Sequence, residues 1–195
     1  MAYPTVAEIR ARVKKLASTD DFPTAWLQDL IDEFQEKAER YRGVSFVSTT
    51  ATAEKHTLSG QRVVRLEWPV ITSITSATVT DSAGTVTTLT VADIVIDHGA
   101  PLVDLGATYT GVLSITYVHG LATTPPSIVR ACREYVRASA LRDFSGVGRD
   151  VETQGFEGGG TTRYVVENWA EGRPTAYLEV NSLLNGVRDY RLVNL

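Results

Sequence analysis

Few of the side chains that most often carry chemistry are grouped in this chain. Its three histidines, His56, His98 and His119, are far apart and belong to no H-x-x-x-H or H-E-x-x-H pattern. His98 follows Asp97 at an expected turn, where a metal ligand and a solvated turn histidine are both open, and we favour the solvated residue. The histidines therefore predict no metal site.

The sequence also indicates no nucleophile and no phosphate loop. Cys132 is the single cysteine, so no intrachain disulfide is possible, and its apolar neighbours indicate a buried residue. The glycine-rich residues 155–160 lack the Lys-Ser/Thr of a phosphate loop, and no G-x-S-x-G elbow occurs. We expect no enzyme, no catalytic residue and no cofactor, although acids on distant segments could still meet in the fold.

Composition narrows the class of partner. Hydrophobic residues make up 43% of the 195 positions and charged residues 22%, which is typical of a folded domain with one buried core. The net charge of −4 argues against a protein that grips nucleic acid through its phosphates. No apolar run approaches the roughly 20 residues of a membrane span, and the polar start lacks a signal peptide. We expect synthesis in the cytoplasm and no membrane contact.

Two helices are predicted in the first forty residues. Thr5 and Glu8 fit a capping box, and apolar residues recur at helical spacing from Val6 to Leu16. A second helix is expected from Pro23, with Gly43 as its C-terminal cap. Its apolar face carries Trp26, Leu27, Leu30, Ile31, Phe34, Ala38 and Tyr41, and its polar face carries Gln28, Asp32, Glu36 and Arg40.

A β-rich insert is predicted at 44–118, where Val, Ile and Thr are abundant. Short strands joined by tight turns indicate an antiparallel sheet or sandwich. The expected strands are 45–52, 62–67, 71–80, 86–91, 93–96 and 112–118. The expected turns are Ser59-Gly60, the hairpin tip 81–84, residues 98–101 and Thr110-Gly111.

A third helix is predicted at 127–141. Its expected core face carries Ile128, Ala131, Cys132, Tyr135, Val136 and Ser139. Arg130, Arg133 and Arg137 fall at i, i+3 and i+7 and form a basic stripe in an otherwise acidic protein. The stripe is either a solvated face, on which Glu134 pairs with Arg130 or Arg137, or a face that meets an acidic surface of a neighbouring subunit. We favour the solvated face slightly.

The C-terminal part is predicted to be a linker and an arm. Residues 146–162 are glycine-rich and are expected to be a mobile linker. Beyond them lie an expected helix at 174–190 and an apolar tail, which cannot be stable alone in water. This segment either folds back on its own core or docks on another protein. The residues expected to dock are Tyr177, Leu178, Leu183, Leu184, Val187, Tyr190, Leu192, Val193 and Leu195.

The order of these segments resembles the head-to-tail adaptor, or connector, proteins of long-tailed (siphovirus-type) bacteriophages. The resemblance covers residues 6–43, the run Arg-Val-Val-Arg-Leu-Glu-Trp-Pro-Val-Ile-Thr-Ser-Ile at 62–74, the strand-to-helix junction at 113–128 and the glycine-rich segment with its apolar tail. The Thr-rich β insert departs from the smaller, almost purely helical adaptors and resembles longer versions from phages of actinobacteria.

The resemblance implies a structural subunit of the virion neck. Such adaptors form a ring of twelve copies beneath the portal protein and continue the DNA channel toward the stopper and tail, and DNA passes the lumen without sequence-specific binding. The resemblance makes 177–195 the portal-binding arm and the three helices the ring wall. The expected fold class is α+β: a helical core at 1–145 with an antiparallel β insert at 44–118, a linker at 146–162 and a flexible docking arm at 163–195.

Three other functions stay open, one of which is an enzyme whose site is assembled from distant residues and would be marked by a deep pocket with converging polar groups. The β-rich middle would suit another neck or tail completion protein, such as a stopper. A β-sandwich module that binds carbohydrate or a cell-surface ligand is the second alternative, but Trp26, Trp68 and Trp169 are too few and too scattered to support it. The proteins contacted on each side, or a groove of exposed aromatic residues, would distinguish them.

Overall fold

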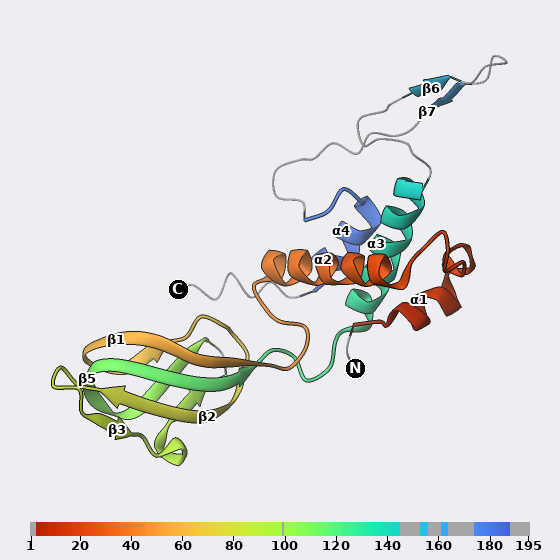
Figure 1. Cartoon of the computed structure of the whole chain (residues 1–195). Helices are drawn as coiled ribbons and strands as arrows, with labels where there is room; N and C mark the ends of the chain where they lie inside the picture. The colour runs from red at the N-terminus through yellow and green to blue at the C-terminus, as the bar shows by residue number, and fades with distance from the viewer. Residues whose placement is uncertain (1–2, 99, 145–152, 156–160, 164–173, 188–195) are drawn as a thin grey trace. The chain divides into compact units, whose positions relative to one another are not determined.

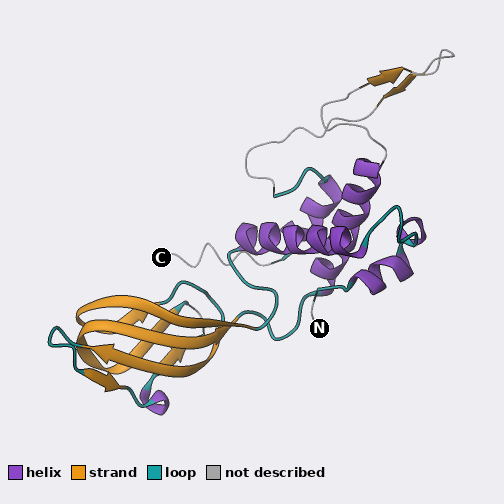
Figure 2. Cartoon of the chain, in the orientation of Figure 1, coloured by secondary structure: helices purple, strands orange, loops and turns teal. Residues whose placement is uncertain are grey.

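The computed structural model describes residues 3–98, 100–144, 153–155, 161–163 and 174–187 (Figure 1). Their contacts divide the chain into two compact units. The β unit is Arg42–Thr124, and the helical unit combines Tyr3–Tyr41 with described residues from Pro125 to 187. The long helices and the main antiparallel sheet fall into separate units (Figure 2), so the predicted α+β class is confirmed.

The helical unit contains the predicted helices, except that the helical pattern from Val6 to Leu16 is interrupted at Val13. They are α1 (Val6–Arg12), a short 3-10 helix (Lys14–Leu16), α2 (Thr24–Arg42), α3 (Pro126–Phe144) and α4 (Leu178–Asn185). The capping box is confirmed: Thr5 Oγ1 accepts from the Glu8 N–H, and the Glu8 carboxylate accepts from the Thr5 N–H. Gly43, directly after α2, has a φ of 64°, which suits glycine at a helix end. The last helix is shorter than the expected 174–190.

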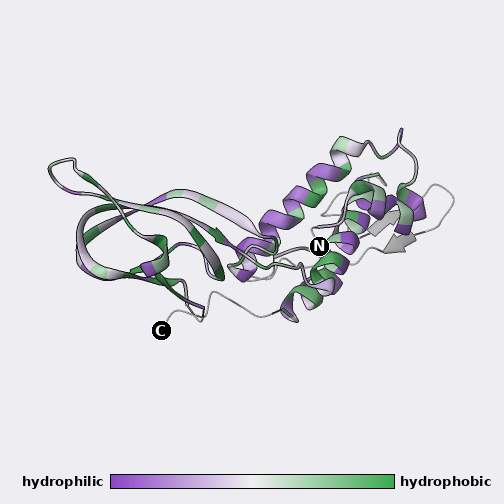
Figure 3. Cartoon of the chain, turned by 90° about the horizontal axis from the view of Figure 1, so that it is seen from below, coloured by the Kyte–Doolittle hydropathy of each residue, from purple (hydrophilic) through white to green (hydrophobic). Residues whose placement is uncertain are grey.

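The apolar faces of α2 and α3 pack against each other and form the core of this unit. The rings of Phe34 and Tyr135 lie 5.6 Å apart, and Lys37 Nζ donates to the Tyr135 hydroxyl at 3.0 Å. Val180 and Leu184 bring α4 into the same core, where both are buried. Figure 3 shows hydrophobic and hydrophilic residues alternating along the helices. The predicted core face of α3 is confirmed, with Ile128, Ala131, Cys132, Tyr135, Val136 and Ser139 all buried.

The β unit is one curled antiparallel sheet organised around its last strand. Its strands are β1 (Thr49–Arg65), β2 (Ile71–Thr80), β3 (Val86–Thr88), β4 (Val95–Asp97) and β5 (Leu102–His119). The order is β1-β5-β2-β3, and β4 also pairs with β5. One side of β5 pairs with β1 along most of its length, while the other side pairs first with β4 and then with β2. The sheet curls over its inner face (Figure 1).

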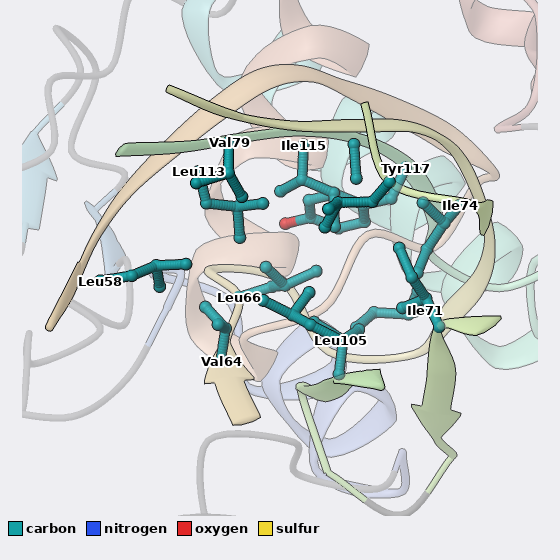
Figure 4. Packing of buried hydrophobic residues seen from close by; sticks show 14 residues of the cluster. Leu58, Val64, Leu66, Ile71, Ile74, Val79, Leu105, Leu113, Ile115 and Tyr117 are labelled. Carbon is teal, nitrogen blue, oxygen red and sulfur yellow. The ribbon is translucent and has the colours of Figure 1, made fainter. Parts of the chain in front are cut away.

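The inner face of this sheet holds a separate hydrophobic core (Figure 4). Alternate residues of β5, including Val103, Leu113 and Ile115, are fully buried there because successive side chains of a strand point to opposite faces. The complete cluster is Leu58, Val64, Leu66, Ile71, Ile74, Ala77, Val79, Leu89, Ile94, Val103, Leu105, Leu113, Ile115 and Tyr117.

Two of the expected turns are wrong. Ser59-Gly60 lies inside β1 and Thr110-Gly111 inside β5, so the expected strands 45–52 and 62–67 contribute to a single strand and 112–118 is only the second half of another. Gly60 forms part of a β-bulge in β1. The pairing register shifts between Ser59 and Gln61, and Gly60 has a φ of 77°. A bulge and a tight turn use the same residue types, which is why local sequence mistakes one for the other.

The shorter strands also depart from expectation in their bounds. β3 ends at Thr88, and a 3-10 helix over Val91–Asp93 follows where the strands at 86–91 and 93–96 were expected. The strand Ile71–Thr80 and the hairpin tip after it are confirmed. At that tip the Asp81 carboxylate accepts from the Ala83 and Thr85 N–H groups, which closes the turn.

A small hairpin lies within the stretch expected to be a linker. β6 (Thr153–Gly155) pairs antiparallel with β7 (Thr161–Arg163). The rest of 145–162 lies outside the described residues. Three-residue strands rich in Thr and Gly carry no alternating apolar pattern, so the sequence held no signal for this pairing.

Candidate interaction surfaces

The basic stripe, defined as Arg130, Arg133 and Arg137, lies on the outward side of α3. At 3.6 residues per turn these positions fall together, roughly opposite the buried face of the helix. The side chains of Arg130 and Arg137 are 61% and 45% exposed, and Arg133 is half-buried. The structure thus brings the three predicted residues together on one solvent-facing surface.

Two arginines of the stripe have acidic partners inside the chain. Arg130 donates to Glu179 of α4 at 3.0 Å, and Arg137 donates to Glu134 at 2.8 Å. Arg133 has no acidic partner in the described part of the chain. Exposed ion pairs of this kind contribute up to about 1 kcal/mol, so they leave the arginines able to exchange partners.

The residues predicted for the docking arm fall on both sides of the described boundary. Leu184 is buried in the helical unit, whereas Tyr177, Leu183 and Val187 are half-buried and Leu178 is 55% exposed. The sequence left open whether this segment folds back on its own core or docks on another protein. The burial of Leu184 agrees with fold-back for that residue. The remaining predicted arm residues, Tyr190, Leu192, Val193 and Leu195, lie outside the described residues.

A buried side-chain network fixes the start of α4. The Asn181 side-chain carbonyl accepts from the Thr175 N–H at 3.1 Å and from its hydroxyl at 2.7 Å, and the Asn181 amide donates to the Thr175 carbonyl at 2.8 Å. The Tyr177 hydroxyl lies 3.2 Å from Ser139 Oγ, and the Arg142 guanidinium lies over the Tyr177 ring. Because buried polar groups are costly unless hydrogen-bonded, this network specifies where α4 sits in the helical unit.

A polar cluster around Glu54 lies in the β unit, and sequence reasoning missed it. The Glu54 carboxylate accepts from the Tyr117 hydroxyl and, at 2.9 Å, from the Glu67 N–H, and it lies 2.6 Å from His56 Nε2. Glu54 and His56 share a face of β1 with buried Leu58, because alternate residues of a strand point the same way. That alternation was the only local signal for the cluster.

Burial sets the protonation of this cluster. It raises the pKa of the Tyr117 phenol, with the Glu54 carboxylate adding to the shift, so the phenol stays a hydrogen-bond donor. His119 is 3% exposed and stacks on Trp68 with ring centroids 4.9 Å apart, and burial lowers its pKa. The Glu54 carboxylate satisfies the Tyr117 hydroxyl and the Glu67 N–H, whereas the buried His119 Nδ1 has no hydrogen-bond partner in the described structure. The hydrogen bonds of Glu54 tie β1 to β5.

The described residues offer no centre for metal chemistry or thiol chemistry. No group of three or more His, Cys, Asp or Glu side chains among them is arranged to hold a metal ion. His98 is exposed at a turn, as the sequence predicted. Cys132 is fully buried, as the sequence predicted, and that burial raises its pKa to about 12. None of the described helices is both long and apolar enough to cross a membrane.

Comparison with solved structures identifies a chain with a related fold. A chain in a structure described as "Neck of empty GTA particle computed with C6 symmetry" superposes with a TM-score of 0.56 and 17% sequence identity, over 96% of this chain and 92% of that one. The two chains share a fold. A chain in "Neck of native GTA particle computed with C12 symmetry" matches over 71% of this chain and 82% of its own length, with 18% identity and a TM-score of 0.46. No family model and no curated protein matches the sequence.

Proposed function

We propose that this chain is a non-catalytic structural subunit of the neck of a phage-type particle. Its specific role would be that of a head-to-tail adaptor: a ring of about twelve copies that binds the portal protein and continues the DNA channel toward the stopper and tail. The observation that carries the proposal is the shared fold with a chain of a GTA particle neck, which extends over nearly the whole of both chains. Similarity of that extent includes both the helical unit and the β unit.

The sixfold symmetry of that neck structure agrees with a ring. A closed ring built from one repeated contact has rotational symmetry, and a twelve-membered ring also satisfies the sixfold symmetry of the neck structure. In this proposal the helical unit forms the wall of the ring, because α2 and α3 are its longest rigid elements at 19 residues each.

The charge of the chain suits passage of DNA rather than capture. Tight binding of a duplex needs many Lys and Arg contacts to phosphates, and each contact adds affinity. A chain with a net charge of −4 would line a channel without holding the DNA in place. The proposed location is the virion neck, between capsid and tail.

The C-terminal arm is the proposed contact with the portal. The structure anchors α4 through Val180 and Leu184, so the docking surface in this proposal starts at exposed Leu178 and continues through the residues beyond Val187. The tail residues Tyr190, Leu192, Val193 and Leu195 supply apolar side chains for such a contact.

The test is to mix the purified chain with the portal ring of the same particle and to image the product by electron microscopy. We expect an added ring of density on one face of the portal, with twelvefold averaging that resolves individual subunits. If the chain leaves the portal bare but binds the opposite end of an assembled neck, it is a stopper or completion protein. A well-folded monomer that binds neither would overturn the neck assignment.

A further inference from the structure

An acidic stripe on α2 matches the basic stripe of α3. Asp29, Asp32 and Glu36 stand at i, i+3 and i+7, the same spacing as the three arginines, and all three side chains are exposed. They lie on the side of α2 opposite buried Leu27 and Phe34. The first and last residues of each stripe are seven positions apart, which is about 10 Å along the helix. The next position on this side of the helix, one turn after Glu36, is the basic residue Arg40, so the acidic stripe stops at Glu36.

The two stripes lie on separate exposed faces of the α2–α3 pair. The helices meet through their apolar faces, where the rings of Phe34 and Tyr135 lie 5.6 Å apart. Each stripe lies on the exposed side of its own helix, opposite that helix's buried side chains. Within the described chain no ion pair joins the two stripes: Asp32 accepts from Gln28, and Asp29 and Glu36 have no basic partner there. A single copy cannot bring its two stripes together without unpacking its core.

We propose that the acidic stripe of one copy docks on the basic stripe of the next copy. Complementary patches on two different faces of a subunit produce a head-to-tail contact, which closes into a ring when the rotation per step allows it. A two-fold dimer would need both patches on the same side. The inference rests on the proposed neck function for the ring, and it names the surfaces that build the ring.

The arginines must exchange partners to make this contact. Arg130 and Arg137 would leave or share Glu179 and Glu134, and both pairs are exposed enough for that exchange to cost little. Opposite stripes also select register, because a shift by one turn leaves charges unmatched. Since the contact is electrostatic and near the surface, added salt should weaken assembly.

The experiment uses two charge-reversed full-length variants. One carries Arg130→Glu, Arg133→Glu and Arg137→Glu, and the other carries Asp29→Lys, Asp32→Lys and Glu36→Lys. Each variant alone has like charges on both stripes, so we expect assembly to need at least roughly tenfold more protein than wild type. Mixed one to one they have opposite charges at every alternating contact, so rings should return. Sedimentation velocity and electron microscopy read the size.

A matched control carries Arg12→Glu, Lys14→Glu and Lys15→Glu, which changes the net charge by the same amount at exposed positions outside both stripes. It should assemble like wild type. Recovery in the mixture also shows that both variants fold, because unfolded chains cannot restore a contact. Unchanged assembly of either single variant, no recovery on mixing, or a wild type that stays monomeric at every concentration would each overturn the inference.

The same variants separate this inference from the proposed function. Copies that associate through the stripes but add no density to a portal would leave the contact standing and remove the adaptor role. Portal-bound rings that still form with either variant alone would support the adaptor role and overturn the contact.

Discussion

Gly111, on the central strand β5, has a φ of 135°, and a Cβ at this position would lie 2.3 Å from the Thr80 carbonyl oxygen on β2. Gly84, at the hairpin tip, has a φ of 84° but open space around it. We expect Gly111→Ala to lower the free energy of unfolding by about 3 kcal/mol and Gly84→Ala by about 1 kcal/mol, because only the first adds a backbone clash to the strained φ. Urea unfolding followed by circular dichroism measures both, and equal losses would contradict the packing argument.

His119 should make the β unit sensitive to acid. Burial lowers its folded-state pKa below the ordinary 6.5, and the Glu54 carboxylate only partly opposes the shift. The unfolded chain therefore takes up the proton first as the pH falls, so stability is complete above about pH 6.5 and decreases from there down to the folded pKa. We expect His119→Phe, which keeps a ring against Trp68, to flatten the stability profile between pH 5 and 7. An unchanged slope would assign the acid sensitivity to other groups.

At the scale of elements, local sequence predicts helices better than strands in this chain. α2 and α3 have 19 residues each, so a 3.6-residue period repeats often enough to fix both the helix and its buried face. β1 and β5 are nearly as long, but glycines interrupt both: β1 was expected as two strands, and of β5 only 112–118 was expected. Only the partner strand shows that Gly60 marks a bulge rather than a turn, and the partner is distant in sequence.

The candidate surfaces also differ in whether local sequence is enough to predict them. The basic stripe belongs to one helix and could be predicted from spacing alone. The Glu54 cluster could not, because Glu54 and Tyr117 are 63 residues apart and meet only through the register of β1 with β5. Two residues of the acidic stripe, Asp32 and Glu36, belong to the polar face that the sequence predicts, but the significance of the stripe depends on how α2 and α3 are packed.

Truncations should separate the part of the C-terminal segment that belongs to the fold from the part that docks. Ending the chain after Gly160 removes Val180 and Leu184 from the core, so we expect the helical unit to lose several kcal/mol, about 2–5 for each large buried side chain deleted. Ending it after Val187 keeps α4 and should leave the melting temperature within a few degrees of wild type. Only the second truncation tests the arm directly: it should stay folded and lose portal binding. Portal binding that survives it would limit the docking surface to residues before 188, such as exposed Leu178.

At the scale of the molecule, the two ends of the β unit, where the chain passes into it and out of it, lie next to each other. The Leu121 N–H donates to the Ser45 carbonyl at 3.0 Å, and Thr49 pairs with His119 where the sheet begins. The β unit also has its own core, which is separate from the packing of α2, α3 and α4. Adjacent ends and an independent core are the conditions under which an inserted segment can be removed without unfolding its host.

We therefore expect the helical unit to survive replacement of residues 49–119 by a flexible linker of about four Gly and Ser residues. The variant keeps the Ser45–Leu121 contact and the hydrogen bond from Thr124 to the Phe46 carbonyl, so the segments that lead into and out of the sheet stay paired. Circular dichroism should show helix without strand and a cooperative thermal transition. Both charged stripes remain, so the variant should form rings with as many subunits as wild type. A folded variant that stays monomeric would mean that the β unit builds part of the contact between copies, and the stripes alone would then be insufficient to hold the ring.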